Sequence, residues 1–114
     1  MVLPDPPPLE IAPEELAALR AAGGGHAIVD VREAWEVAIC GFPAALHVPL
    51  GELAQRVGEL PAERPLVVVC HTGRRSLLAT RYLRQTGRGR ATNLQGGVEA
   101  WALSIDPHMA RSRY

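Results

Sequence analysis

The sequence predicts an α/β fold, with a mainly parallel central sheet of about five strands and helices on both faces. Short apolar segments rich in Val, Ile and Leu alternate with segments whose apolar residues recur at helical spacing. Strands of parallel sheets are covered on both faces, so they appear in a sequence as continuous apolar runs. The chain has 114 residues, which is the usual length of one domain.

Five segments are predicted to be strands. The clearest is Leu66 to Val69, where four apolar residues, three of them β-branched, follow one another. The other four are shorter or less uniform, and each is followed by a helical or turn-forming segment. They are Leu9 to Ile11, Ala27 to Val31, Leu46 to Val48 and Ala91 to Leu94.

Helices are expected between these strands. Pro13 begins the first one, because proline fits the first turn of a helix and the following carboxylates favour its positive end. The last helix has apolar residues at i, i+3, i+4 and i+7 from Val98 to Ile105. Trp101, on this helix, and Trp35 are expected to be core or partly buried. The remaining predicted helices run from Glu33 to Ile39, from Glu52 to Leu60 and from about Arg75 to Gln85.

The folded domain is expected to span residues 9–105. Residues 1–8 are rich in proline, which disfavours hydrogen-bonded structure, so an extended lead-in is predicted there. Residues 106–114 are expected to form a C-terminal tail. The 12 basic and 12 acidic residues balance, which gives no reason to expect binding to nucleic acid or to a membrane.

The chain has two cysteines, Cys40 and Cys70. They are too few for a disulfide scaffold and do not have the spacing of metal ligands, so no metal site is expected. A reducing, cytoplasmic compartment is the natural setting for such a chain. No secretory or transmembrane segment is evident, and the protein is expected to be soluble.

Cys70 directly follows the predicted strand Leu66 to Val69, and the next helix begins five residues later. Amide groups of the loop and the positive end of the helix stabilise an anion at this place. Cysteine thiols near a helix N-terminus and arginine side chains are favoured in the thiolate form. Gly73 allows conformations in which several amide groups converge on the sulfur. We therefore expect Cys70 to be a reactive thiolate.

Three blocks of the sequence resemble the signatures of rhodanese-like sulfurtransferases. Cys70 to Arg75 resembles the active-site loop of that family, and Asp30 to Glu33 resembles its upstream block. Asn93 to Gly97, with Trp101, resembles its downstream block. The resemblance implies the fold predicted above and a Cys70 nucleophile. Such a nucleophile takes sulfur from thiosulfate or a persulfide donor and passes it to a thiophilic acceptor, with no cofactor.

The resemblance also implies roles for the residues around Cys70. Arg75 would close the loop, and Arg74 would either bind anionic donors or remain a solvated surface charge. Asp30 and Arg32 would brace the neighbouring loop. The residues implied to form the loop and contact the substrate are His71, Thr72, Gly73, Arg74 and Arg75.

His71 and Cys40 depart from the family pattern. His71 stands where the family often has arginine, and we expect an exposed ring on the loop. Cys40 lies where members of the family often carry a Gly-His-Ile stretch, and the histidine is missing here. We expect a half-buried cysteine rather than a resolving thiol. The tail from Asp106 to Tyr114, which closes with Arg113 and Tyr114, resembles the end of rhodanese domains fused to ubiquitin-activating-like sulfur-transfer proteins. A sulfur-carrier or thioredoxin-like protein is therefore a candidate acceptor, besides the small-molecule donor.

Two other functions remain open from the sequence. Cysteine phosphatases and related arsenate reductases use a Cys-x5-Arg loop, in which arginine clamps a tetrahedral oxyanion. Here the spacing from Cys70 to Arg75 is one residue shorter, and Ser76 takes the sixth place. A smaller loop suits one added sulfur better than a phosphate. The third hypothesis is a binding module that keeps the fold and docks a partner without chemistry.

Overall fold

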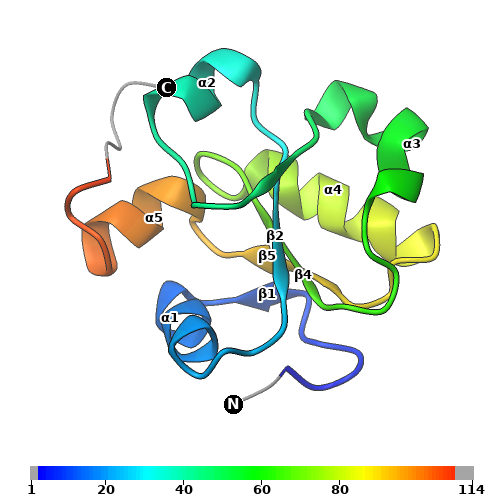
Figure 1. Ribbon diagram of the computed structural model, residues 1–114, viewed down its shortest axis with the longest axis horizontal. Helices are drawn as coiled ribbons and strands as arrows, with labels where there is room; N and C mark the ends of the chain where they lie inside the picture. Colours follow the sequence, from blue (N-terminus) through cyan, green and yellow to red (C-terminus); the bar gives the residue numbers. More distant parts are fainter. Residues whose placement is uncertain (1–2, 110–114) are drawn as a thin grey trace.

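Five parallel strands form one sheet in the computed structural model, which describes residues 3–109 (Figure 1). The order across the sheet is β1-β5-β4-β2-β3, and all of the paired strands run parallel. This confirms the predicted sheet. The strands are β1 (Glu10–Ile11), β2 (Ala27–Asp30), β3 (Leu46–His47), β4 (Leu66–Val69) and β5 (Ala91–Leu94).

Helices cover both faces of the sheet, as the sequence predicts (Figure 1). The helices α1 (Pro13–Ala21) and α5 (Gly97–Ser104) share one apolar cluster with Val67 and Val69 of β4. The helices α3 (Leu53–Arg56) and α4 (Arg74–Gln85) share the other cluster with Val68. The short helix α2 (Ala34–Ile39) follows β2.

The central strand β4 divides its side chains between the two clusters. Successive side chains of a strand point to opposite faces, so Val67 and Val69 pack on one side, and Leu66 and Val68 on the other. All four are at most 1% exposed. Burying each such side chain contributes about 1.5–3 kcal/mol, so the strand that carries Cys70 lies in the most strongly packed part of the protein.

The segment from Glu52 to Leu60 is helical, as expected, but it is divided into short turns. The segment forms a 3₁₀ turn, η1 (Leu50–Glu52), then α3, then a second 3₁₀ turn, η2 (Val57–Glu59). Only Leu53 and Leu60 are fully buried between residues 50 and 60, so this segment has too narrow an apolar face to stabilise one continuous helix. Gly58 weakens it further.

The expectation for Trp35 is also wrong, because 57% of this residue is exposed. Helix α2 has six residues, and it buries Glu36 instead of the neighbouring indole. Trp101 does belong to the core, where its ring centroid lies 5.0 Å from that of Phe42. The sequence pattern alone does not indicate that a carboxylate takes the buried position on α2.

The described part of the proline-rich lead-in lies against the sheet. Leu3 is 6% exposed and joins the cluster of α1 and α5. Arg84 of α4 donates hydrogen bonds to the carbonyl oxygens of Pro7, Pro8 and Ala91, at 2.6, 2.8 and 2.8 Å. The division into lead-in, domain and tail stays a prediction; residues 1–2 and 110–114, including Arg113 and Tyr114, lie outside the described residues.

We predict that Arg84→Ala lowers the free energy of unfolding by about 1–3 kcal/mol, because three carbonyl groups lose a charged donor. Arg81→Ala is the matched control, since Arg81 is exposed on the same helix. Urea unfolding of both variants measures the difference. Equal stabilities for the two variants would contradict a stabilising role for the hydrogen bonds of Arg84.

Candidate active site

The loop between β4 and α4 lies at the carboxyl end of the sheet. Cys70 follows Val69, the last residue of β4, and Asp30 ends the neighbouring strand β2 in register with Val69. In open α/β sheets, ligands bind outside the carboxyl ends of the strands. The loop runs from Cys70 to Gly73, which precedes α4 (Figure 1).

The Cys70 sulfur accepts two hydrogen bonds from its own loop and helix. The Gly73 amide donates to Sγ at 3.1 Å, and the Ser76 hydroxyl donates to it at 3.2 Å. Cys70 is 1% exposed and also belongs to the apolar cluster under α4. The sulfur is therefore buried, but the side facing the loop is polar.

This geometry corrects the expectation that several amides converge on the sulfur. Among the described residues, the donors to Sγ are one amide and one hydroxyl. Ser76 was not predicted as part of the site, although its position in the first turn of α4 is a signal. A hydroxyl one turn into a helix reaches back toward the residue before that helix.

Gly73 has a conformation that only glycine adopts readily, with φ at +93°. A Cβ at this position would lie 2.9 Å from the Gly96 nitrogen and 3.3 Å from the Leu94 oxygen. The Asn93 amide side chain donates to the Gly73 carbonyl at 3.1 Å. The loop is thus packed directly on the backbone that follows β5.

The beginning of α5 holds the other end of the loop. The Val98 amide donates to the Cys70 carbonyl at 2.8 Å, and the Glu99 amide donates to the His71 carbonyl at 3.0 Å. Gly97 has φ at +63°, and a Cβ there would overlap both of these carbonyl oxygens. The loop backbone is therefore fixed by unpaired amides of a helix N-terminus.

Arg75 joins the loop to α2 through a two-pronged ion pair. Its Nη1 and Nη2 donate to Oε1 and Oε2 of Glu36 at 2.6 and 2.7 Å. The guanidinium of Arg75 lowers the pKa of the Glu36 carboxyl, although burial of that carboxyl works in the opposite direction. Glu36 in turn raises the pKa of Arg75, and the Cys70 sulfur adds to this more weakly.

Glu36 is the residue that the sequence analysis missed. It is 2% exposed and lies 39 positions before its partner. A single carboxylate on a six-residue helix carries no sequence signal about a partner so far along the chain.

Asp30 and Arg32 form a buried ion pair beside this region. The Arg32 Nη2 donates to Asp30 Oδ2 at 2.7 Å and to the Cys40 carbonyl at 2.7 Å. Both side chains are at most 1% exposed. Burial lowers the pKa of Arg32, but hydrogen bonds and charge from Asp30 outweigh this effect and raise it above its usual value. The pair ties the end of β2 to the end of α2.

The remaining loop residues form the rim of the site. Thr72 and Arg74 are exposed. The His71 side chain is 21% exposed, which is less than the exposed ring that was expected, and its Nε2 lies 3.6 Å from Glu99 Oε1. The role of each loop residue toward a substrate stays a prediction. Cys40 is half-buried, the environment that was expected for it.

Within residues 3–109, no cluster of three or more His, Cys, Asp or Glu side chains is arranged to hold a metal ion. In the same part of the chain, none of the helices has the length and apolar character needed to cross a membrane.

The parallel sheet, with a cysteine loop at its carboxyl end, places the chain in a class of α/β proteins with a cysteine directly after the central strand. The chain belongs to the family of rhodanese-like domains, whose family model matches residues 12–104. The family resemblance of the three sequence blocks is therefore confirmed.

Relatives of this chain are named as sulfurtransferases. A sulfurtransferase of Allochromatium vinosum is 40% identical over 93 residues, which cover 82% of this chain and 87% of that protein. The adenylyltransferase and sulfurtransferase MOCS3 of Aedes aegypti is 35% identical over 107 residues, covering 85% of this chain but 24% of that protein. The human single-domain sulfurtransferase TSTD1 has a TM-score of 0.73 at 29% identity, covering 84% of this chain and 96% of that one. These relatives support sulfur transfer as the general activity.

We predict that Glu36→Gln lowers the free energy of unfolding at pH 7 by about 1–3 kcal/mol, because a charged hydrogen-bonded pair is lost. The pKa of Glu36 is lower in the folded state than its reference value of 4.5. The stabilisation is therefore complete above about pH 4.5 and is lost as the pH falls through the lowered pKa. Glu63→Gln, at an exposed position outside the helices, is the control.

Urea unfolding between pH 3 and pH 7 tests this prediction. The difference in free energy of unfolding between the unsubstituted protein and Glu36→Gln should narrow as the pH falls. Glu63→Gln should have the stability of the unsubstituted protein at every pH. A difference in free energy of unfolding that stays constant from pH 3 to pH 7 would contradict the ion pair between Glu36 and Arg75.

We predict that Gly97→Ala slows sulfur transfer and destabilises the protein by about 1–3 kcal/mol, because the left-handed backbone is strained by a side chain. The added methyl would also push the carbonyls of Cys70 and His71 away from α5. Gly51→Ala is the matched control, since an added Cβ there meets open space. Thermal unfolding and single-turnover rates of both variants check this. If Gly97→Ala is as active as Gly51→Ala, then close packing of α5 against the Cys70 loop is not needed for sulfur transfer.

Proposed function

We propose that this protein moves sulfane sulfur through a persulfide on Cys70, from thiosulfate or a persulfide donor to a thiophilic acceptor. The observation that carries the proposal is the polar setting of Sγ, between the Gly73 amide and the Ser76 hydroxyl. These donors stabilise a sulfur anion, and Arg75 adds a positive charge nearby.

In the first step, the Cys70 thiolate attacks the outer sulfur of thiosulfate. A bond forms between Sγ and that sulfur, and the bond between the two sulfur atoms of thiosulfate breaks. Sulfite leaves with the bonding electron pair, so no external oxidant or reductant is required. The enzyme retains a persulfide anion, whose charge is stabilised by the same loop.

In the second step, an acceptor nucleophile attacks the outer sulfur of the persulfide. With a thiolate acceptor, a new persulfide forms on the acceptor, and the bond between Sγ and the outer sulfur breaks. Cys70 leaves as a thiolate and is ready for another donor. This two-step route predicts ping-pong kinetics.

The burial of Cys70 favours small donors. With 1% of the residue exposed, a donor reaches Sγ only if side chains at the loop rim make way. Thr72 and Arg74, both exposed, are the loop residues that we propose to meet an anionic donor first. Thiosulfate carries two negative charges, which a guanidinium binds well.

Two features favour sulfur over phosphate as the transferred group. The loop is one residue shorter than the Cys-x5-Arg loop of phosphatases. Arg75 directs Nη1 and Nη2 at Glu36, so these nitrogen atoms are engaged away from an incoming oxyanion. A phosphatase needs its arginine for that oxyanion.

We propose a sulfur-carrier or thioredoxin-like protein as the acceptor, and the cytoplasm as the compartment. The relative in Aedes aegypti joins sulfurtransferase and adenylyltransferase in its name, and the aligned region is 24% of its length. The chain has two cysteines, which are too few for a disulfide scaffold, and this suits a reducing compartment.

Intact mass spectrometry after incubation with thiosulfate tests the proposal. We expect a mass gain of one sulfur atom that persists in Cys40→Ala and is absent from Cys70→Ser, because Cys70 alone carries the persulfide. The gain should disappear after cyanide is added. A protein that acquires no sulfur from thiosulfate or a persulfide donor would refute the proposal. Cys70-dependent hydrolysis of an aryl phosphate would favour the phosphatase alternative instead.

A further inference from the structure

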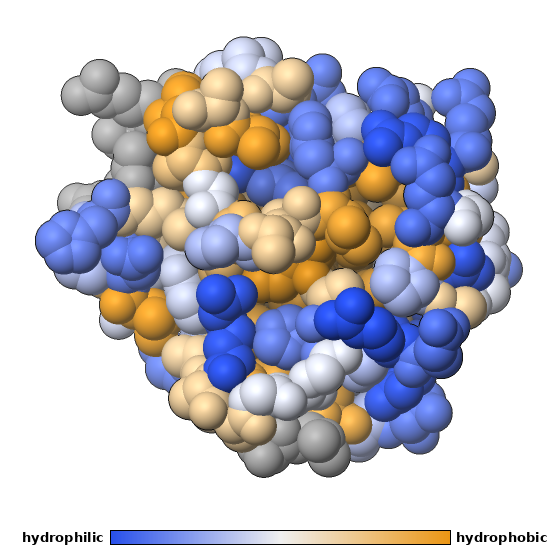
Figure 2. Space-filling view, viewed as in Figure 1, coloured by the Kyte–Doolittle hydropathy of each residue, from blue (hydrophilic) through white to orange (hydrophobic). Residues whose placement is uncertain are grey.

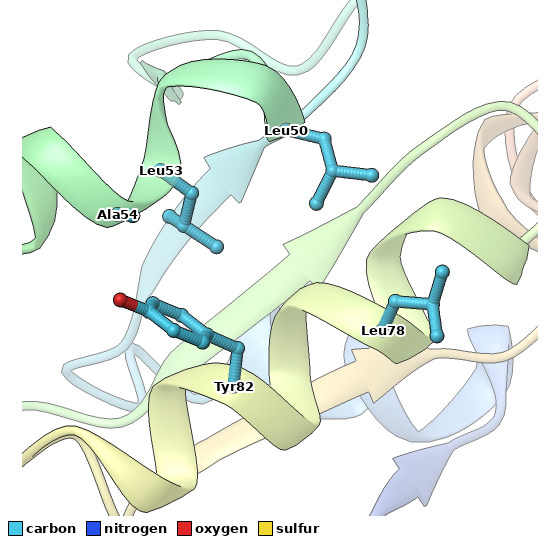
Figure 3. A pocket seen from close by; sticks show the side chains of 5 residues that line it. All are labelled: Leu50, Leu53, Ala54, Leu78 and Tyr82. Carbon is cyan, nitrogen blue, oxygen red and sulfur yellow. The ribbon is translucent and has the colours of Figure 1, made fainter.

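An apolar pocket lies between α4 and the segment formed by η1 and α3 (Figure 3). Its volume is about 280 Å³, and its walls are apolar apart from one tyrosine hydroxyl. Leu78 is 63% exposed and Tyr82 is 37% exposed, so large apolar side chains face solvent here. The lining residues are Leu50, Leu53, Ala54, Leu78 and Tyr82. We call this pocket the α3–α4 groove.

The α3–α4 groove leads toward the cysteine loop. The Leu50 amide donates to the Val31 carbonyl at 3.0 Å, which places one wall at the carboxyl end of β2. Leu78 follows Arg74 by four positions on α4, so the two residues lie on the same helix face. Tyr82 lies a further turn along this face. The groove therefore begins one helical turn from the loop that holds Cys70.

The two sides of the groove differ in charge. On the α4 side, Arg74 and Arg81 are exposed. On the α3 side, Arg56 pairs with Glu52 at 2.9 Å and with Glu59 at 3.0 Å, which leaves one net negative charge there. Figure 2 shows an apolar surface across the middle of this face, with hydrophilic residues along its sides.

We propose that the α3–α4 groove docks the protein that accepts sulfur from Cys70. The docked segment would place apolar side chains in the groove and carboxylates beside Arg74 and Arg81 of α4. This inference rests on the proposed function, because it assumes that Cys70 gives sulfur to a protein thiol. Docking raises the effective concentration of that thiol at the loop, which speeds transfer without any change in the chemistry.

The shape of the groove favours a protein segment over the other occupants of an apolar surface. The apolar side chains line a recess between two helical segments, whereas insertion into a lipid interface requires a protruding apolar face. The positive charges of Arg74 and Arg81 on the α4 side attract a segment that carries both acidic and apolar side chains. A second copy of this chain would have to supply such a segment from its own surface.

The test uses two synthetic peptides, each with two leucines and a C-terminal cysteine. One carries two glutamates, and the other carries two lysines at the same positions. We expect the acidic peptide to bind about tenfold more tightly than the basic one, as measured by fluorescence anisotropy with the Cys70→Ser protein. We also expect Leu78→Asp to weaken binding of the acidic peptide about tenfold. Arg81→Glu should reverse the preference between the peptides.

Leu103→Asp is the matched control, because Leu103 is 62% exposed on the opposite face of the sheet, on α5. It should leave peptide binding unchanged. Transfer from thiosulfate to cyanide should be the same in Leu78→Asp, Leu103→Asp and the unsubstituted protein. Transfer to the acidic peptide thiol should show a raised KM in Leu78→Asp alone.

Several outcomes would overturn the docking inference. These are equal binding of both peptides, an unchanged affinity in Leu78→Asp, a Leu78-dependent dimer in light scattering, and Leu78-dependent binding to anionic lipid vesicles. Failure of the proposed function is distinguishable, since it would abolish transfer to cyanide while selective peptide binding persisted.

Discussion

The chemistry of this protein depends on how the backbone of one short loop is held. Amide groups of Val98 and Glu99, at the beginning of α5, donate to the carbonyls of Cys70 and His71. These bonds orient the loop carbonyls away from the sulfur, which leaves Sγ to the Gly73 amide and the Ser76 hydroxyl. A loop free to turn its carbonyls inward would repel a sulfur anion instead of stabilising it. The strand β4 beneath it provides a rigid base, because its side chains pack on both faces of the sheet.

The arginine residues around this loop have three different roles. Arg32 is fully buried with Asp30 and fixes the backbone between β2 and α2. Arg75 is partly exposed and binds Glu36, which connects the loop to α2 and keeps a positive charge near the sulfur. Arg74 and Arg81 are exposed on α4 and are available to anions. The role of each arginine thus depends on its burial and its partner: a buried ion pair fixes the backbone, a partly exposed one connects two elements, and an exposed guanidinium supplies surface charge.

Most of the fold follows from local patterns in the sequence. The run Leu66 to Val69 predicts the central strand because every residue in it is apolar, and the helix after Gly73 has clear periodicity. The helical character of the segment from Glu52 to Leu60 is also predictable, but its division into short turns is not. Few of its residues are buried, so tertiary contacts rather than periodicity decide its form. In the site, Cys70 and its loop could be predicted, since strand, cysteine and glycine are adjacent. Glu36 could not, because its partner Arg75 is brought close only by the folded sheet.

The central claim is that the loop around Cys70 stabilises one added sulfur atom as an anion. A crystal structure of the protein after reaction with thiosulfate tests it most directly. We expect electron density for a second sulfur bonded to Cys70 Sγ, within hydrogen-bonding distance of loop donors and with the bonds from α5 retained. Crystals in which Cys70 stays unmodified, or in which the added sulfur points into the apolar cluster with no polar donor near it, would contradict the account.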